Sequence, residues 1–411
     1  MRRGLIAGGL VAASVLVMAA PAAADPVRDA EYWLDEYGIR AAWNTTQGAG
    51  VTIAVIDTGV DGTVPELQGA VISGADFSGL GRADGQQPVG PDDEKDHGTM
   101  VASLAAGRGT GGANGVIGAA PAATILPISI GFGEGSLSSD DQIAAAVRYA
   151  TDAGADVINM SLTRNTLEWP TSWDDAFLYA MEHDVVIVAA AGNRGSGTTQ
   201  VGAPATMPGV LTVAGVDKNG EASFDASSQG ITIGVAAPSE QLVGVTPGGG
   251  HVGWDGTSGA TPIVAGIVAL VRAAHPELDA ANVIQRVVAT AKDAGTPGTD
   301  AIYGFGLVDA AAAVNATVPK VTDNPMGSLA EWIKVYRRAA STPVPVPTAT
   351  STPTPAPVVA GPANPLGTVL PTVNLLRNVG VPLLVFVVFA ALIAYVALRA
   401  VRRARAGRRT G

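Results

Sequence analysis

The strongest constraint on the fold is a series of short β-branched runs that alternate with helical patterns. Val51–Ile56 is almost continuously apolar, as expected for a strand that is buried on both faces of a sheet. Amphipathic patterns over 140–153 and 173–183 predict helices between such runs. Further runs of the same character cover 124–130, 157–162, 185–191, 210–216 and 232–236. The alternation predicts repeated β-α-β units, and therefore an α/β fold around a mostly parallel sheet.

The composition excludes several kinds of site and partner. The 411 residues contain no cysteine, so disulfides, thiolate nucleophiles and zinc–cysteine sites cannot form. The formal net charge is −11, with 36 acidic and 25 basic residues. Because nucleic-acid binding depends on basic surfaces, this balance argues against a nucleic-acid partner.

Residues 1–24 have the organisation of a secretory signal peptide. Two arginines precede an apolar run, and small residues lead to a cleavage site expected after Ala24. The mature chain should therefore begin outside the cytoplasm; the alternative is an uncleaved N-terminal anchor. Residues 25–48 then form a polar N-terminal extension whose aromatic side chains we expect to pack on the domain.

The C-terminal part predicts a membrane anchor. A globular domain over 49–318 is followed by a post-catalytic segment, 319–340, which is expected to contain a short amphipathic helix against the domain or the membrane surface. Residues 341–372 are rich in proline and threonine, which is typical of an extended spacer. Residues 379–398 carry no charge and are long enough to cross a bilayer as a helix. The arginines within 399–411 predict a cytoplasmic tail and a single-pass plasma-membrane protein with its domain outside; the alternative is a buried soluble helix.

A candidate nucleophile lies in the stretch Gly256–Pro262, where Ser258 stands between small residues. Small neighbours allow another backbone to approach the hydroxyl. The apolar run Ile263–Val271 predicts a buried helix, so Ser258 should lie near a helix N-terminus. Free N–H groups at such a terminus suit a developing oxyanion. Taken alone, the stretch could equally be a simple helix cap.

A serine hydroxyl needs a base, and the chain has four histidines. His97 follows an acid and opens a small-residue helix, whereas His251 lies in a glycine loop close to Ser258 in sequence and is the alternative base. Asp57, at the end of the first strand, is placed to orient the imidazole. Asn193, at another strand exit, and the Ser258 N–H could donate to the oxyanion.

The sequence predicts no cofactor and no metal site. The acidic loop 84–96 lacks an ordered ligand spacing, so a solvated loop is favoured over a calcium site. The glycine-rich stretch 107–118 lacks the lysine and spacing of a phosphate-binding loop.

These motifs together resemble the subtilases, the subtilisin-like serine proteases of family S8. Residues 55–60, 96–102 and 256–262 match the three signatures of that family in order, and Asn193 falls on its oxyanion asparagine. Over about 30–315 the resemblance implies a three-layer sandwich and hydrolysis of peptide bonds through an acyl-enzyme. It also implies that the substrate adds a strand beside residues 128–131 and 161–163. The residues implied to bind substrate are Ser161, Leu162, Thr163, Ala190 and Gly192.

Two positions depart from the family pattern. Gly259 follows the nucleophile, where a methionine or an aromatic residue is usual, and this should alter packing rather than chemistry. Thr163 stands where glycine is common, which puts the shape of the S1 side in question.

The layout of the whole chain is similar to that of the mycosins, the membrane-anchored subtilases of type VII secretion systems. The segment 324–330 also resembles their post-catalytic region, although the disulfides found in many mycosins are absent here. This resemblance implies a polypeptide substrate and the type VII machinery as partner. The alternative is a scaffold that stabilises a membrane secretion complex, with proteolysis secondary.

Overall fold

The computed structural model describes residues 25–337, except for 92–93, 112–113 and 136. All described residues belong to one compact unit. The predicted signal peptide, linker, transmembrane helix and basic tail lie outside the described residues.

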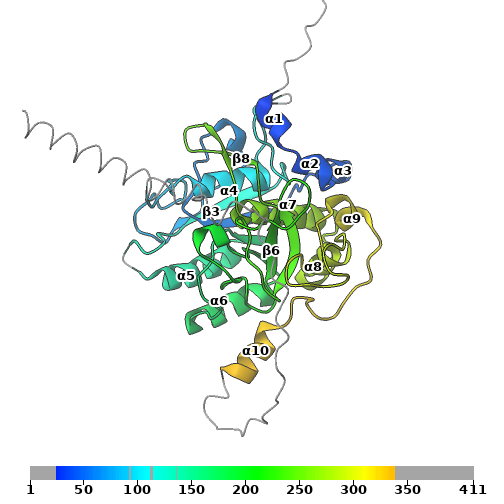
Figure 1. The fold of residues 1–411 in the computed structure, drawn as a ribbon. Helices are drawn as coiled ribbons and strands as arrows, with labels where there is room; N and C mark the ends of the chain where they lie inside the picture. Colours follow the sequence, from blue (N-terminus) through cyan, green and yellow to red (C-terminus); the bar gives the residue numbers. More distant parts are fainter. Residues whose placement is uncertain (1–24, 92–93, 112–113, 136, 338–411) are drawn as a thin grey trace, which may run out of the picture. The chain divides into compact units, whose positions relative to one another are not determined.

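A seven-stranded sheet forms the centre of the domain, in the order β2-β3-β1-β4-β5-β6-β7 (Figure 1). All of its pairings are parallel, which confirms the predicted sheet. Every residue of β4 and β5 is buried, because helices cover both faces of a parallel sheet. The strands are β1 (Thr52–Asp57), β2 (Ala75–Asp76), β3 (Thr124–Ser129), β4 (Val157–Met160), β5 (Val186–Ala190), β6 (Leu211–Val216) and β7 (Ile233–Pro238).

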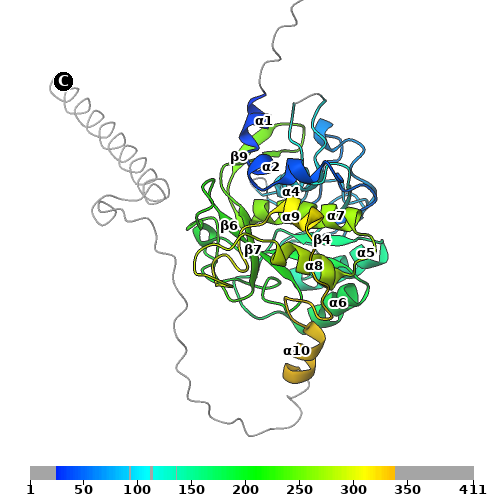
Figure 2. The same ribbon diagram turned by 90° about the vertical axis from the view of Figure 1, so that its right-hand side faces the viewer.

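Helices form the two outer layers, so the predicted three-layer sandwich is confirmed (Figures 1 and 2). One layer contains α4 (His97–Ala106) and α7 (Thr257–Ala274), with α8 (Ala280–Ala289) and α9 (Ala310–Asn315) packed against α7. The other contains α5 (Ser139–Asp152) and α6 (Thr171–Glu182), which pack together.

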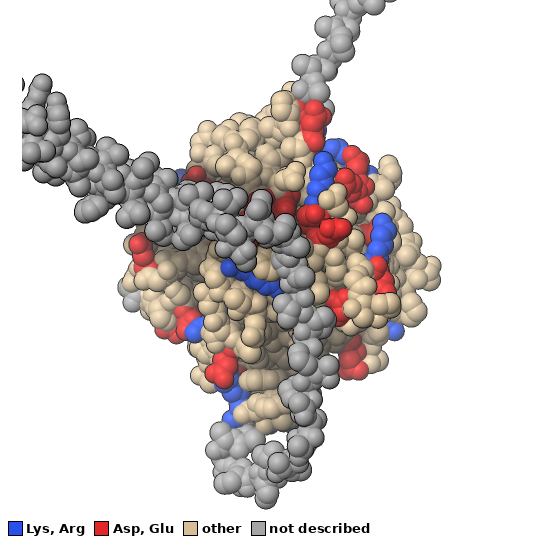
Figure 3. All heavy atoms as spheres, viewed as in Figure 1, with Lys and Arg blue, Asp and Glu red and all other residues tan. Residues whose placement is uncertain are grey.

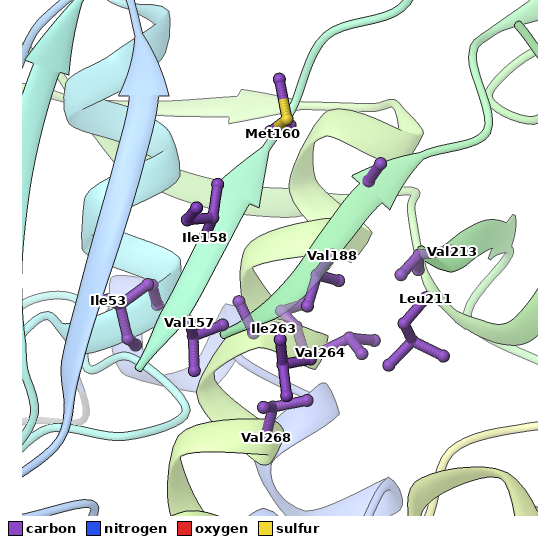
Figure 4. Packing of buried hydrophobic residues seen from close by; sticks show 14 of the residues in the cluster. Ile53, Val157, Ile158, Met160, Val188, Leu211, Val213, Ile263, Val264 and Val268 are labelled. Carbon is purple, nitrogen blue, oxygen red and sulfur yellow. The ribbon is translucent and has the colours of Figure 1, made fainter. Parts of the chain in front are cut away.

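Helix α7 is the central element of the core. Figure 4 shows Ile263, Val264 and Val268 of α7 beside the strand residues Val157 and Val188. Among the described residues, α7 is also the one helix long and apolar enough to cross a membrane, but 83% of that window is buried within the domain. Its hydrophobicity is therefore explained by its packing between the sheet and the neighbouring helices.

An antiparallel hairpin, β8 (Leu242–Val245) and β9 (His251–Trp254), was not predicted from the sequence. Both strands contain a glycine, and more glycines separate them, which weakens the pattern on which strand prediction depends. The hairpin packs on α4.

The N-terminal extension packs on the domain through three short helices, α1 (Pro26–Ala30), α2 (Trp33–Glu36) and α3 (Ile39–Ala42). Trp33 is fully buried, and the Tyr32 hydroxyl donates to the carbonyl of Glu240 at 2.8 Å. The buried Glu31 carboxylate accepts from the Ile117 N–H at 2.7 Å. The aromatic residues therefore pack on the domain, as the sequence suggested.

The post-catalytic segment contains α10 (Leu329–Tyr336), a short helix that contacts α6. Trp332 packs against Trp169, with ring centroids 4.4 Å apart. Arg337 follows the helix and binds the Asp174 carboxylate at 2.8 Å. This part of the predicted amphipathic helix thus packs against the domain.

Charged side chains of both signs are mixed on the face of the domain that Figure 3 shows. On the face shown in Figure 3, the lysines and arginines of the described residues are scattered among the acidic residues and form no continuous patch.

Candidate active site

Asp57 and His97 form the first pair of the site. Asp57 ends β1 and is fully buried. The Nδ1 atom of His97, the first residue of α4, lies 2.8 Å from Asp57 Oδ1 and 3.0 Å from Oδ2. Because the carboxylate can only accept, Nδ1 carries the proton and Nε2 is left as the basic nitrogen.

The start of α4 is attached to the end of β1 by hydrogen bonds of Thr58. Its hydroxyl accepts from the Gly98 N–H at 2.9 Å and donates to the Lys95 carbonyl at 2.9 Å. Gly98 is required for this approach, since a Cβ there would lie 2.3 Å from the carbonyl oxygen of Gly59. The glycine thus makes room for the strand-end loop.

The environment of His97 favours its protonated form. Burial alone would lower the pKa of the ring, but the charge of Asp57, the hydrogen bond to Asp57 and the charge of Glu94 together raise the pKa above its ordinary value. Such an imidazole accepts a proton readily and is stabilised as a cation.

Ser258, the second residue of α7, faces the same cleft and is held by Ser161. The Ser258 hydroxyl donates to the carbonyl of Ser161 at 3.1 Å, and the Ser161 hydroxyl donates to the carbonyl of Ser258 at 2.9 Å. In the described structure the Ser258 hydroxyl is therefore turned toward Ser161, and it must rotate to reach Nε2 of His97.

The second of these bonds follows from a proline. In a regular helix the N–H of residue 262 would donate to the carbonyl of Ser258, but Pro262 has none. The freed carbonyl accepts from Ser161 instead. Pro262 is the sixth residue of α7 and so lies inside the helix.

Asn193 follows β5, and Thr257 fixes the orientation of its side-chain amide. Asn193 Oδ1 accepts from the Thr257 N–H at 2.8 Å and from the Thr257 hydroxyl at 2.9 Å. The Thr257 hydroxyl in turn accepts from the Gly192 N–H at 3.1 Å. The amide Nδ2 is thereby directed away from Thr257, and it lies 3.0 Å from a Cβ built on Gly256. Within the described residues neither this NH₂ nor the Ser258 N–H has an acceptor, so both can donate to an incoming oxyanion.

His97, Asn193 and Ser258 line a cleft with a cavity of about 360 Å³. Of the residues predicted to bind substrate, Ser161 lines this cavity, whereas Leu162, Thr163, Ala190 and Gly192 do not. Phe132, Trp254 and Asp255 also line it, and the motifs gave no signal for these three residues. The sequence signal that could have indicated Trp254 is its position three residues before Thr257, together with the unusual glycine at position 259.

The Thr163 side is closed by a neighbouring segment. The Arg164 N–H donates to the carbonyl of Ala203 at 2.8 Å. A Cβ on Gly202 would lie 1.7 Å from the Arg164 oxygen and 2.6 Å from Thr163 Oγ1. The two segments thus lie in direct contact, and the Thr163 hydroxyl occupies space that a glycine would leave open.

The other histidines are engaged elsewhere. His251 begins β9, and its Nε2 lies 2.7 Å from the buried Glu66 carboxylate. His183 and His275 bond to backbone carbonyls of Tyr179 and Val314. The geometry therefore favours His97 over the alternative base, His251.

Within the described ranges, no group of three or more His, Asp and Glu side chains could hold a metal ion. In the acidic loop, Asp84 binds Arg82 and accepts from the Gln86 N–H at 3.0 Å. Asp92 and Asp93 of this loop lie outside the described residues. That the loop is solvated and binds no calcium therefore stays a prediction.

The sequence of the domain matches one known family. The model of the subtilase family covers residues 48–306. The chain belongs to the subtilase family. The resemblance inferred from the three motifs is thus confirmed, and its relatives include thermitase and subtilisins, which places it in a family of hydrolases.

The subtilase has relatives among both other serine proteases and mycosins. It is 40% identical over 265 residues to the thermophilic serine proteinase of Bacillus sp. (strain AK1), covering 64% of this chain and 62% of the relative. It is 33% identical over 344 residues to Mycosin-1 of Mycolicibacterium smegmatis, covering 70% and 73%. The crystal structure of MycP1 from Mycobacterium smegmatis aligns at a TM-score of 0.60 and 30% identity, covering 72% of this chain and 86% of that chain. The chain therefore spans less than two thirds of the thermophilic proteinase.

Proposed function

We propose that this subtilase is a serine endopeptidase in which Ser258 is the nucleophile, His97 the general base and Asp57 the residue that orients His97. The observation that supports this most directly is the Asp57–His97 pair, 2.8 Å apart, in a cleft that Ser258 and Asn193 also line. The family to which the chain belongs supports the same chemistry.

The reaction proceeds through an acyl-enzyme. Ser258 Oγ attacks the scissile carbonyl carbon while His97 Nε2 takes its proton, and the carbonyl oxygen becomes an oxyanion. The Asn193 amide and the Ser258 N–H donate to that oxyanion. When the C–N bond breaks, His97 returns the proton to the leaving amine. Water then attacks the ester carbon, with His97 again as base, and releases the carboxylic acid and Ser258.

We further propose that the protein is exported and anchored as a single-pass membrane protein, with its catalytic domain outside and its C-terminus in the cytoplasm. The supporting features are the sequence patterns of 1–24, 379–398 and 399–411. The similarity to a structure described as MycP1 from the ESX-1 type VII secretion system supports a role beside such a system.

Labelling with a fluorophosphonate probe tests the catalytic proposal. The probe should label the purified domain, and Ser258→Ala should abolish labelling. Ser196→Ala is the matched control, because Ser196 lines the same cavity and should label like the wild type. A folded wild-type domain without labelling, or labelling that persists in Ser258→Ala, would contradict the proposal.

A structural role in secretion is the second candidate. One similar structure is described as a serine protease that is an essential component of the type VII (ESX-1) secretion system, and such a role does not by itself require catalysis. Complementation of a strain that lacks this gene separates the two. Export restored by Ser258→Ala would show that secretion needs the folded protein rather than its chemistry.

A further inference from the structure

The end of the β8–β9 hairpin lies directly against the imidazole of His97. Trp254 is the last residue of β9 and is half-buried. Its ring centroid lies 5.7 Å from that of His97, with the planes at 81°, which is an edge-to-face contact. Asp57 holds His97 from the Nδ1 side, so the two neighbours contact the imidazole in different ways.

Two glycines provide the space for the indole. A Cβ on Gly259 would lie 3.3 Å from Trp254 Cζ2 and 2.3 Å from Leu242 Cδ1. A Cβ on Gly244 would lie 3.1 Å from Trp254 Nε1 and 3.0 Å from Met100 Cβ. Any larger residue at either position would therefore displace the indole or its neighbours. The unusual glycine after the nucleophile is thus explained by the packing of the hairpin.

The hairpin itself fixes the position of the indole. Leu242 and Trp254 are directly paired across the two antiparallel strands. The Leu242 side chain is buried and reaches the start of α7. The hairpin that carries the indole therefore also contacts Gly259, through Leu242.

The indole is held by shape rather than by a hydrogen bond. Within the described residues its buried Nε1 has no hydrogen-bond partner. An unpaired buried N–H is unfavourable, so the tryptophan is not explained by its polar group. A phenylalanine should retain the aromatic contact without that donor, and it is therefore the natural matched substitution.

We propose that Trp254 is a positioning residue that holds the imidazole of His97 in the orientation needed to receive the Ser258 proton. This inference rests on the proposed role of His97 as base. The hydrogen bond to Asp57 restrains one nitrogen but leaves the ring free to tilt, and the edge-to-face contact restricts that tilt. The restraint matters because the Ser258 hydroxyl must turn from Ser161 toward a ring that stays in place.

Steady-state kinetics on a fluorogenic peptide tests the proposal. Trp254→Ala should lower kcat by about two- to twelvefold, the factor that corresponds to an edge-to-face aromatic contact, with KM nearly unchanged. Trp254→Phe should restore most of kcat. Gly259→Ala should also lower kcat, because its Cβ collides with Leu242, and Leu242→Ala in the same chain should relieve that loss.

The alternative outcomes overturn the proposal. An unchanged kcat in Trp254→Ala, or a rise in KM alone, would mean that Trp254 contacts substrate or nothing relevant to the base. The Nδ1 proton resonance of His97 gives a readout that needs no turnover. It should broaden or vanish in Trp254→Ala and persist in Trp254→Phe, and an unchanged resonance would refute the positioning role. Failure of fluorophosphonate labelling in the wild type would instead refute the catalytic proposal, independently of this resonance.

Discussion

Replacing Thr257 by valine should separate the orientation of Asn193 from its presence. Valine has the shape of threonine and keeps the backbone N–H that donates to Asn193 Oδ1 at 2.8 Å. It removes the hydroxyl that donates to the same oxygen at 2.9 Å and accepts from the Gly192 N–H at 3.1 Å. The amide thus loses one of two restraints, and a buried N–H loses its acceptor.

The magnitudes differ for stability and for rate. Loss of one neutral hydrogen bond costs about 0.5–1.5 kcal/mol, and an unsatisfied buried N–H adds about 1–3 kcal/mol, so the free energy of unfolding should fall by roughly 2–4 kcal/mol. Complete loss of an oxyanion donor costs about 10²–10³ in kcat, a range that comes from mutagenesis of a subtilisin. Because the amide keeps one restraint in Thr257→Val, kcat should fall less, by about tenfold.

The assay is kcat and KM on a peptide substrate, together with urea unfolding, for Thr257→Val, Asn193→Ala and the control Thr257→Ser. Serine keeps the hydroxyl, so this variant should retain most of kcat. If Thr257→Val lost stability but kept the wild-type kcat, Thr257 would stabilise the fold without orienting the donor.

Three further predictions concern specificity and pH. Thr163→Gly should raise kcat/KM for substrates with large P1 side chains relative to small ones, because it removes the hydroxyl beside Gly202; an unchanged ratio would contradict this. Since His97 must be neutral to act as base and its pKa is raised, activity should fall on acidification with a midpoint above 6.5, and Asp57→Asn should lower that midpoint. Burial outweighs the Ile117 N–H and the Arg28 charge and raises the pKa of Glu31 from 4.5 to about 8. The folded state therefore holds this proton more tightly, so its contribution to stability should decrease from pH 4.5 to about 8, and Glu31→Gln should flatten that pH dependence.

The parts of the structure that could be predicted are those that a local sequence pattern records, whereas contacts between distant residues could not be predicted. The runs that became β1 and β5 were recognisable because buried parallel strands carry their pattern locally. Asp57 and His97 could be proposed as site residues because each stands in a short motif. The reciprocal bonds between Ser161 and Ser258 join residues that are 97 positions apart, and no local pattern records such a contact.

The features that the sequence did not reveal also depend on contacts between segments that are distant in the chain. The hairpin was missed because its glycines are selected by the approach of Trp254 and Leu242 rather than by strand propensity. Thr163 does not line the cavity, because Gly202 and its neighbours lie against that side, and its role in substrate binding stays a prediction. Both outcomes depend on which segments meet in three dimensions.

The contact between the two ends of the domain has a consequence for how the chain folds. The Ala310 N–H donates to the carbonyl of Tyr37 at 2.9 Å, and the Thr45 hydroxyl bonds to Asn315 at 2.7 Å. Because α3 packs on α9, the first segment of the domain has no complete binding site until the last segment has been synthesised. Folding in order from the N-terminus therefore cannot complete the packing of α3, because this contact joins residues that are far apart in the chain and so has a high contact order. A chain interrupted before α9 would keep the contacts of its first segment with Ile117 and Glu240 but would leave one face of α3 uncovered.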